Sequence, residues 1–204
     1  MSGAPEVGAA AVAAAPPPAS SPEPIEQRLR ERFPDVPFRR QEGPAVRDHT
    51  LYVPASRLIE ICSFLRDDPQ CQMTMLSWVG GVDLLPKQPR FEVIYHLLSL
   101  AHNVRFVLKV EVSEENAIVP SVAGVWPTAN WHERETYDFY GIIFDGHPDL
   151  TRILLPDEWV GWPLRKDSPL GYQEVAFTHN TPGRTTPEPD LTRLKPKKVR
   201  YRAH

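Results

Sequence analysis

Residues 126–141 hold the densest group of side chains that could do chemistry. They read Trp-Pro-Thr-Ala-Asn-Trp-His-Glu-Arg-Glu-Thr-Tyr-Asp-Phe-Tyr-Gly, so that His132 stands beside Glu133 and two more carboxylates follow at Glu135 and Asp138. A His-Glu pair is half of a zinc-protease motif, and Glu-x-x-His pairs on two helices can hold two metal ions. Paired carboxylates can also hydrolyse glycosides.

Each of these catalytic interpretations lacks a required partner. A zinc protease needs a second histidine four residues after the first, and Thr136 occupies that position. The chain has no Glu-x-x-His pair for a two-metal site, and carboxylate pairs on an acidic helix are too common to indicate a glycosidase. It also has no phosphate-binding glycine loop and no nucleophile elbow. We therefore do not expect a self-sufficient enzyme.

The same stretch is predicted to form a helix. Thr128 or Asn130 can cap its start, acidic residues crowd its first turns, and Gly141 is placed to end it. Aromatic and charged residues alternate all round this helix, whereas a helix packed on one core has a single polar face. It is therefore expected to lie between two layers or against an external partner, which we favour. A solvated helix edge beside the core is the alternative.

The charges of this helix give specific expectations. Arg134 and Asp138 are four residues apart and can pair with each other. Glu133 and Glu135 have no local cation at good spacing, so that a covered position would require cations from elsewhere. We interpret the two glutamates as anchors across an interface.

The elements around this helix follow from hydrophobic periodicity. A fully apolar stripe at i, i+3, i+4 and i+7 predicts one helix, and alternation over residues 104–112 predicts a strand with one wet face. Residues 91–100 are apolar on both sides, which predicts a strand covered on both faces. Asn103 can take a positive φ in a hairpin between these two strands. The remaining predicted elements are a helix at 25–33, a strand at 49–53, a helix over Leu58, Ile61, Cys62 and Leu65, and a strand at 73–79.

This order of helices and strands predicts an α+β fold, a two-layer domain with helices on one face of a partly antiparallel sheet. We assign residues 1–24 to a disordered Ala/Pro-rich arm, 25–162 to the domain, and 163–204 to an extended basic, Pro-containing tail. From residue 181 onward there are seven basic and two acidic residues. The tail could be solvated, contact anionic lipid or dock on an acidic neighbouring subunit, which we favour. Nucleic-acid binding by the tail is a lower-ranked alternative.

Composition excludes several classes. Net charge is -3, which argues against a dedicated nucleic-acid binder. Two cysteines, Cys62 and Cys71, are too few for a disulfide framework, a four-cysteine zinc site or a self-contained iron-sulfur cluster. They are most simply interpreted as small buried residues. The longest small apolar run, residues 8–15, is too short to span a bilayer. Residues 1–24 lack the basic residues of a signal or transit peptide.

Two blocks together resemble one protein family. The first is Glu133-Arg134-Glu135-x-x-Asp138-Phe139-Tyr140, followed after six residues by His147 and then by Ile153-Leu154. The second is Trp159-Val160-Gly161-Trp162-Pro163-Leu164-Arg165-Lys166-Asp167. Both are similar to signature segments of the 30 kDa subunit family of respiratory complex I, which in bacteria is the C-type subunit of NADH-quinone oxidoreductase. The resemblance covers roughly residues 25–180, and Thr151 stands where a basic residue is expected.

The resemblance implies a two-layer α+β domain with a mixed sheet and a structural role in the hydrophilic arm. It implies no catalytic, cofactor-binding or metal-binding residue in this chain, with FMN and iron-sulfur clusters carried by partner subunits. The implied partners are the 49 kDa-type subunit and neighbouring peripheral-arm subunits, in a hetero-oligomer of about fourteen subunits. The chain would be peripheral, on the cytoplasmic side of the bacterial cell membrane, and would support electron transfer from NADH to quinone coupled to proton translocation. A ferredoxin-type or other donor is the alternative within the family.

The residues expected at subunit interfaces are those of the two blocks. For His147 a turn with Pro148 and Asp149 is the simpler interpretation, with Asp149 accepting local backbone bonds. Trp159 and Trp162 are expected as aromatic anchors. The full set is Glu133, Arg134, Glu135, Asp138, Phe139, Tyr140, His147, Pro148, Trp159, Trp162, Arg165, Lys166 and Asp167.

Overall fold

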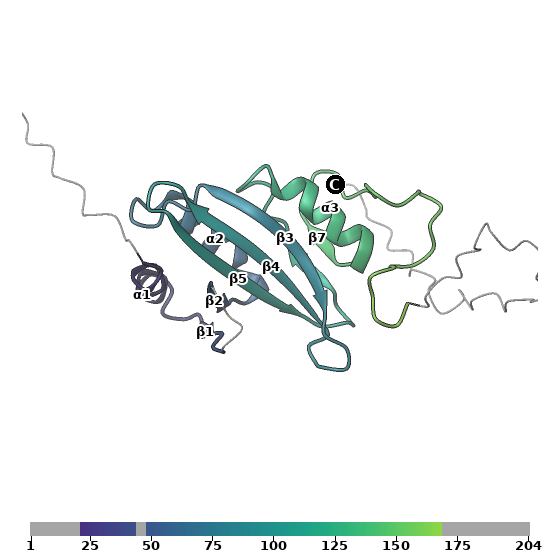
Figure 1. Cartoon of the computed structure of the whole chain (residues 1–204), viewed down its shortest axis with the longest axis horizontal. Coiled ribbons are helices and arrows are strands. Elements are labelled where there is room, and N and C mark those ends of the chain that lie inside the picture. Colours follow the sequence, from purple (N-terminus) through teal and green to yellow (C-terminus); the bar gives the residue numbers. More distant parts are fainter. Residues whose placement is uncertain (1–20, 44–47, 169–204) are drawn as a thin grey trace, which may run out of the picture.

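A five-stranded mixed sheet organises the computed structural model, which describes residues 21–43 and 48–168 of the chain (Figure 1). The strand order is β1-β2-β5-β4-β3, with β2 and β5 parallel and the other neighbours antiparallel. A separate parallel pair joins β6 to β7. The elements are α1 (Glu23–Arg32), β1 (Arg39–Arg40), β2 (His49–Tyr52), the 3₁₀ helix η1 (Ala55–Arg57), α2 (Leu58–Asp67), β3 (Met75–Asp83), β4 (Phe91–Ser99), β5 (Val104–Val112), β6 (Ile118–Pro120), α3 (Ala129–Tyr140) and β7 (Ile143–Asp145).

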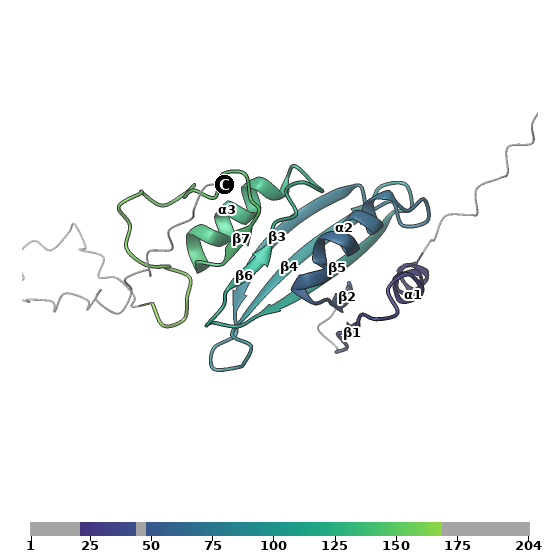
Figure 2. The same ribbon diagram turned by 180° about the vertical axis from the view of Figure 1, so that it is seen from behind.

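Helix α2 covers one face of the sheet, the face turned toward the viewer in Figure 2. Its predicted apolar stripe is confirmed, because all four of its side chains are fully buried. Helix α1 joins the same layer: Phe33, which follows α1, meets Phe64 of α2 edge to face, with ring centroids 5.7 Å apart. The helices therefore form one layer and the sheet the other, as an α+β fold requires.

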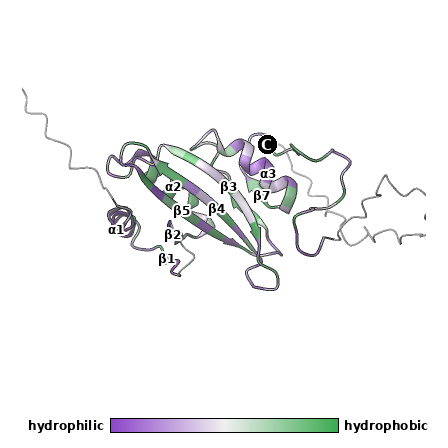
Figure 3. Cartoon of the chain, viewed as in Figure 1, coloured by the Kyte–Doolittle hydropathy of each residue, from purple (hydrophilic) through white to green (hydrophobic). Residues whose placement is uncertain are grey.

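Helix α3 packs closely against β3 at Gly81. A Cβ at this position would lie 2.9 Å from the Tyr140 ring and 3.0 Å from the Thr136 methyl group, both on α3. The missing side chain therefore allows the helix to approach the strand backbone. Figure 3 shows that hydrophilic residues occur along α3.

The prediction that β4 is covered on both faces is wrong within the described part of the chain. Phe91, Val93, Tyr95 and Leu97 are buried under the helices, but on the opposite face Ile94, His96 and Leu98 are only half-buried. Alternation still places apolar side chains on both faces, and among the described residues only one face receives a helix.

The strand spans mostly follow the sequence. The predicted 91–112 hairpin is confirmed, with Asn103 at a φ of 52°. The strand predicted at 73–79 is misplaced: β3 begins at Met75 and continues through Gly80 and Gly81 to Asp83. Packing by α3 over the second glycine explains why these residues stay in the sheet.

The predicted boundaries fall inside ordered structure at both ends. Helix α1 begins at Glu23, within the segment assigned to the arm, and Lys166, within the segment assigned to the tail, donates its amide to Asp83 of β3. The rest of the arm and of the basic tail lie outside the described residues. Within residues 21–43 and 48–168, no helix is both long and apolar enough to cross a bilayer.

Candidate functional site

Helix α3 carries the first family-like block and ends as predicted. Gly141 has a φ of 70°, and its N–H donates to the carbonyl of Tyr137, which closes the last turn. The predicted side-chain cap is wrong: the Thr128 hydroxyl donates instead to the carbonyl of Leu76 on β3, at 3.3 Å. The first turn of the helix holds no acidic residue, and the expected acidic residues Glu133 and Glu135 follow in the second turn.

Glu133 points into its own domain. Its side chain is inaccessible to solvent, and it accepts hydrogen bonds from the Ser121 hydroxyl at 2.5 Å and the Val122 amide at 2.8 Å. Burial raises the pKa of this carboxyl to about 7 despite these two bonds. The expectation that Glu133 anchors a partner is therefore corrected: it joins α3 to the turn that precedes it.

Asp138 is also completely buried, but it is surrounded by donors. Its Oδ2 accepts from the amides of Ile153, Leu154 and Leu155, and its Oδ1 lies 2.7 Å from the guanidinium of Arg152. Burial opposes ionisation, yet these hydrogen bonds outweigh it and lower the pKa of Asp138. Arg152 is thus the ion-pair partner of Asp138, in the place that the i, i+4 spacing predicts for Arg134.

The other two charged motif residues are more exposed. Arg134 donates to the carbonyl and hydroxyl of Thr151, at 3.2 and 3.0 Å, and its guanidinium lies over the Trp131 ring. The predicted Arg134–Asp138 pair is not formed. Glu135 is half-buried and has no ion-pair partner among the described residues, so it stays available to a cation outside the chain.

His147 lies in a turn, as expected. Its Nδ1 accepts from the Asp149 amide at 3.0 Å and its Nε2 lies 3.2 Å from the carbonyl of Asn130, so the histidine and not the aspartate accepts the local bond. Burial lowers the pKa of His147, which favours the neutral ring. Its Nε2 is 4.0 Å from Glu133, while Pro148 is exposed. Both ring nitrogens are thus used structurally.

We call residues 152–168 the strap; it contains no helix or strand and returns over the end of α3. Trp162 packs against Tyr137, with ring centroids 5.2 Å apart, and over Gly141, where a Cβ would lie 2.4 Å from its ring. The Phe139 carbonyl accepts from the amide of Leu164. The strap is therefore fixed to the α3 backbone.

The last strap residues bind the end of α3 and the sheet. Arg165 donates to the carbonyl of Tyr140 at 2.6 Å, and its guanidinium lies over the Phe91 ring. Lys166 donates its amide to Asp83 at 2.9 Å, and Asp167 pairs with Arg90 at 2.5 Å. All three motif residues therefore contact their own domain, although Lys166 and Asp167 are also exposed to solvent.

The strap also presents apolar side chains to solvent. Four of them, which we call the apolar set, are exposed by 43 to 61%: Leu154, Trp159, Val160 and Leu164. Trp131 on α3 is exposed by 61% as well. Of the two predicted aromatic anchors, Trp159 is thus free to contact a partner, whereas Trp162 is used internally.

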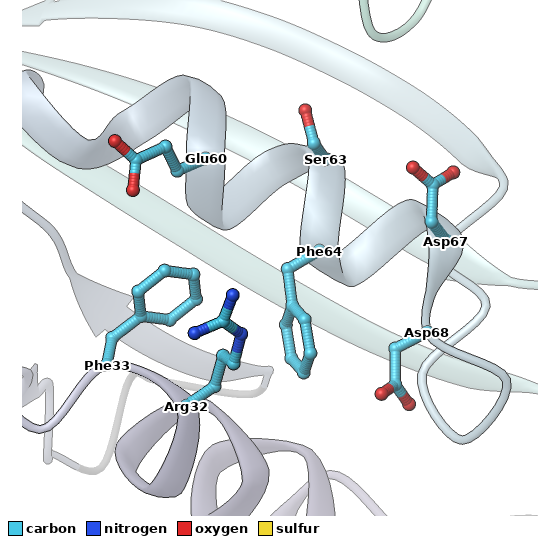
Figure 4. A pocket seen from close by; sticks show the side chains of 7 residues that line it. All are labelled: Arg32, Phe33, Glu60, Ser63, Phe64, Asp67 and Asp68. Carbon is cyan, nitrogen blue, oxygen red and sulfur yellow. The ribbon is translucent and has the colours of Figure 1, made fainter.

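Other candidate sites carry less chemistry. Figure 4 shows a hollow between α1 and α2, lined by Arg32, Phe33, Glu60, Ser63, Phe64, Asp67 and Asp68. Each carboxylate there pairs with an arginine, at 2.6 to 3.3 Å. No group of three or more potential metal ligands occurs within the described residues. Cys62 and Cys71 are free and buried, as predicted, and burial raises the pKa of both thiols.

Several residues that bind the motif residues were not predicted from the sequence. Asp83 and Arg90 lie at the facing ends of β3 and β4, and Ser121 lies in a turn. None of them belongs to a periodic pattern. The sequence around Pro89-Arg90 does not indicate that the arginine is buried or which residues it binds.

The fold and contacts define a two-layer α+β domain whose motif helix anchors an external strap. Over residues 51–174 the sequence matches the family described as "Respiratory-chain NADH dehydrogenase, 30 Kd subunit". The chain belongs to this family of complex I subunits.

Named relatives agree with the match. The C-type subunit of NADH-quinone oxidoreductase from Roseiflexus sp. (strain RS-1) is 51% identical over 156 residues, 76% of this chain and 88% of the relative. The corresponding protein of Herpetosiphon aurantiacus, which has the same name, is 48% identical over 156 residues, 76% of this chain and 89% of the relative.

Two solved structures are similar as well. The trypsin-resistant fragment (1-134) of Nqo5 has a TM-score of 0.53 at 31% identity, covering 63% of this chain and 98% of the fragment. A chain of an archaeal membrane-bound sulfane sulfur reductase has a TM-score of 0.54 at 21% identity, covering 82% of this chain and 96% of that chain. This second likeness shows the shared fold.

Proposed function

We propose that this chain is a non-catalytic subunit of the peripheral arm of a respiratory NADH:quinone oxidoreductase. The anchored strap carries the proposal: the family-like motif fixes a loop that exposes four apolar side chains. Exposed apolar and aromatic side chains on a fixed backbone are typical of protein interfaces. In this role the chain supports the reaction by holding other subunits in position.

The partner that we propose is the 49 kDa-type subunit, with neighbouring peripheral-arm subunits beside it. Trp159 would be an aromatic anchor, and Glu135 would meet a cation of the partner. Glu133, Asp138, Trp162 and the residues 165–167 would act indirectly, because they hold the backbone that presents the apolar set. Phe139, Tyr140, His147 and Pro148 belong to the same supporting region.

The redox groups of the proposed reaction lie in other subunits. Electrons would pass from NADH through FMN and iron-sulfur clusters to quinone, with proton translocation coupled to quinone reduction. Two buried cysteines are too few to ligate a cluster alone. The chain would sit on the cytoplasmic side of the cell membrane as a peripheral subunit.

Co-purification tests this function. The chain is tagged at its N-terminus, membranes are extracted in mild detergent, and the purified material is analysed by mass spectrometry and visible absorption. We expect membrane and cluster-bearing subunits, flavin and iron-sulfur absorbance, and quinone-dependent NADH oxidation. A chain that elutes alone and colourless would contradict the proposal, and oxidation of reduced ferredoxin in place of NADH would identify the alternative donor.

A further inference from the structure

Arg90 is a buried arginine with partners on three segments. Its side chain is 2% exposed and binds Asp83 twice, through Nη2 at 2.8 Å and Nε at 3.1 Å. It also reaches Glu114 at 2.6 Å and both carboxylate oxygens of Asp167, at 2.5 and 3.2 Å. Asp83 and Arg90 belong to the β3–β4 hairpin, whereas Asp167 belongs to the strap.

A second set of bonds joins the same hairpin to the strap. Asp83 accepts from the Lys166 amide at 2.9 Å, and the Lys166 ammonium donates to the carbonyl of Leu85 at 3.0 Å. Bonds from Arg90 and from the amides of Leu85 and Lys166 lower the pKa of Asp83 to about 2, against the effect of its burial. Asp83 is therefore ionised and takes part in both sets.

These contacts form the second of two anchors. Asp138 holds the start of the strap at residues 153–155, and Arg90 with Asp83 holds its end at residues 166–167. Trp159, Val160 and Leu164 lie between the anchors. The strap has no secondary structure of its own, and Trp162, Leu164 and Arg165 hold its middle against α3. The two anchors fix its two ends and so limit where the apolar side chains stand.

The strap-side partner can be lost without breaking the hairpin. The side chain of Asp167 is 47% exposed, whereas those of Asp83 and Arg90 are each 2% exposed. Without Asp167 the guanidinium still has two carboxylates, so that the hairpin stays paired, while the strap end loses its ion pair and keeps only the two Lys166 bonds.

We propose that Asp83, Arg90 and Asp167 form a latch that positions the strap for its partner, and that the partner subunit binds the latched form. This inference rests on the proposed function and adds a positioning role for Asp83 and Arg90, whose side chains are buried in their own domain. Binding to a form that is only partly populated is weakened in proportion to its population. Opening the latch should therefore weaken partner binding without changing the apolar set itself.

Hydrogen exchange of the full-length chain tests the latch directly. For Asp167→Asn we expect amides in residues 161–168 to exchange at least about ten-fold faster. The amides of residues 153–155, held by Asp138, should not change. Asp167→Glu should restore most of the protection, and Arg39→Gln, which removes a surface pair with Glu111 far from the strap in sequence, is the matched control.

Partner binding is measured with the same variants in cells, as the amount of tagged chain recovered in the assembled complex. We expect Asp167→Asn to lower it several-fold and Asp167→Glu to restore it. Unchanged exchange in residues 161–168 would overturn the latch. Faster exchange with wild-type assembly would overturn its role in partner binding. Failure of the wild-type chain to co-purify would contradict the proposed function instead, while the exchange result would still decide whether the latch exists.

Discussion

Glu133 and Asp138 lie five residues apart on α3 and are both inaccessible to solvent, yet their pKa values move in opposite directions. Glu133 receives one hydroxyl and one amide, and burial raises its pKa to about 7. Asp138 receives three amides and the guanidinium of Arg152, which together lower its pKa. The number and charge of the donors, and not burial alone, decide the ionisation state.

The difference separates the two junctions that α3 makes. At the Ser121 turn the helix is held by a carboxyl that is easily neutral, whereas at the strap it is held by a fixed negative charge. Removing one partner of a buried charge that has a full set of hydrogen-bond donors strongly destabilises the fold. The strap junction should therefore be more sensitive to mutation, and the turn junction more sensitive to pH.

Removing the strap junction should have the largest effect. Asp138→Ala leaves three amides without their acceptor and removes the carboxylate that pairs with the nearly buried Arg152, so we expect a loss of about 3 to 5 kcal/mol in the free energy of unfolding. Urea denaturation of the full-length chain measures it. A loss below about 1 kcal/mol would show that the amides find other acceptors.

Changing the turn junction should make stability depend on pH. The folded pKa of Glu133 is raised above 4.5, so its contribution is present below about pH 4.5 and is lost as pH rises through about 7. We expect Glu133→Gln to match the wild type near pH 5 and to gain about 2 to 3 kcal/mol relative to it by pH 8. Parallel stability curves from pH 5 to 8 would contradict the buried neutral carboxyl.

The contact between α3 and the strap can be strained at one position. Gly141→Ala places a side chain at a φ of 70°, which costs about 1 to 2 kcal/mol, and drives a methyl group into the Trp162 ring. We expect a lower midpoint of thermal unfolding together with altered tryptophan fluorescence. Loss of stability without a fluorescence change would mean that Trp162 is not held against the helix end.

The exposed part of the strap should matter least for stability. Trp159→Ala removes a side chain that is 46% exposed, and we expect a change within about 0.5 kcal/mol. The midpoint of thermal unfolding measures this change, and Gly141→Ala is measured in parallel for comparison. A large loss would mean that Trp159 packs on its own domain instead of serving a partner.

The sequence predicted the elements whose signal is local. The α2 stripe, the β4–β5 hairpin with Asn103 and the stop at Gly141 all depend on periodicity or on one backbone angle. The β3 span was wrong because Gly80 and Gly81 have low strand preference, and α3, distant in sequence, supplies the packing that keeps them in the sheet.

The direction of the motif side chains could not be predicted in the same way. Glu133 is predicted as an interface anchor because no local cation is available, and Asp138 is predicted to pair with Arg134. Glu133 instead binds a hydroxyl and a backbone amide, and Asp138 binds three backbone amides and Arg152. Arg90 lies far from Asp167 in the chain, and only the fold brings them together. The family resemblance points to a set of residues without saying which of them face inward.

The proposed role requires the strap to present its apolar set to a partner while the chain takes no part in the chemistry. The variant that tests both halves of this role replaces Trp159 and Val160 by serine. The amount of assembled complex is measured, together with the NADH:quinone turnover of each assembled complex. We predict a clear fall in assembly with unchanged turnover per complex. Wild-type assembly, or normal assembly with reduced turnover, would contradict this role.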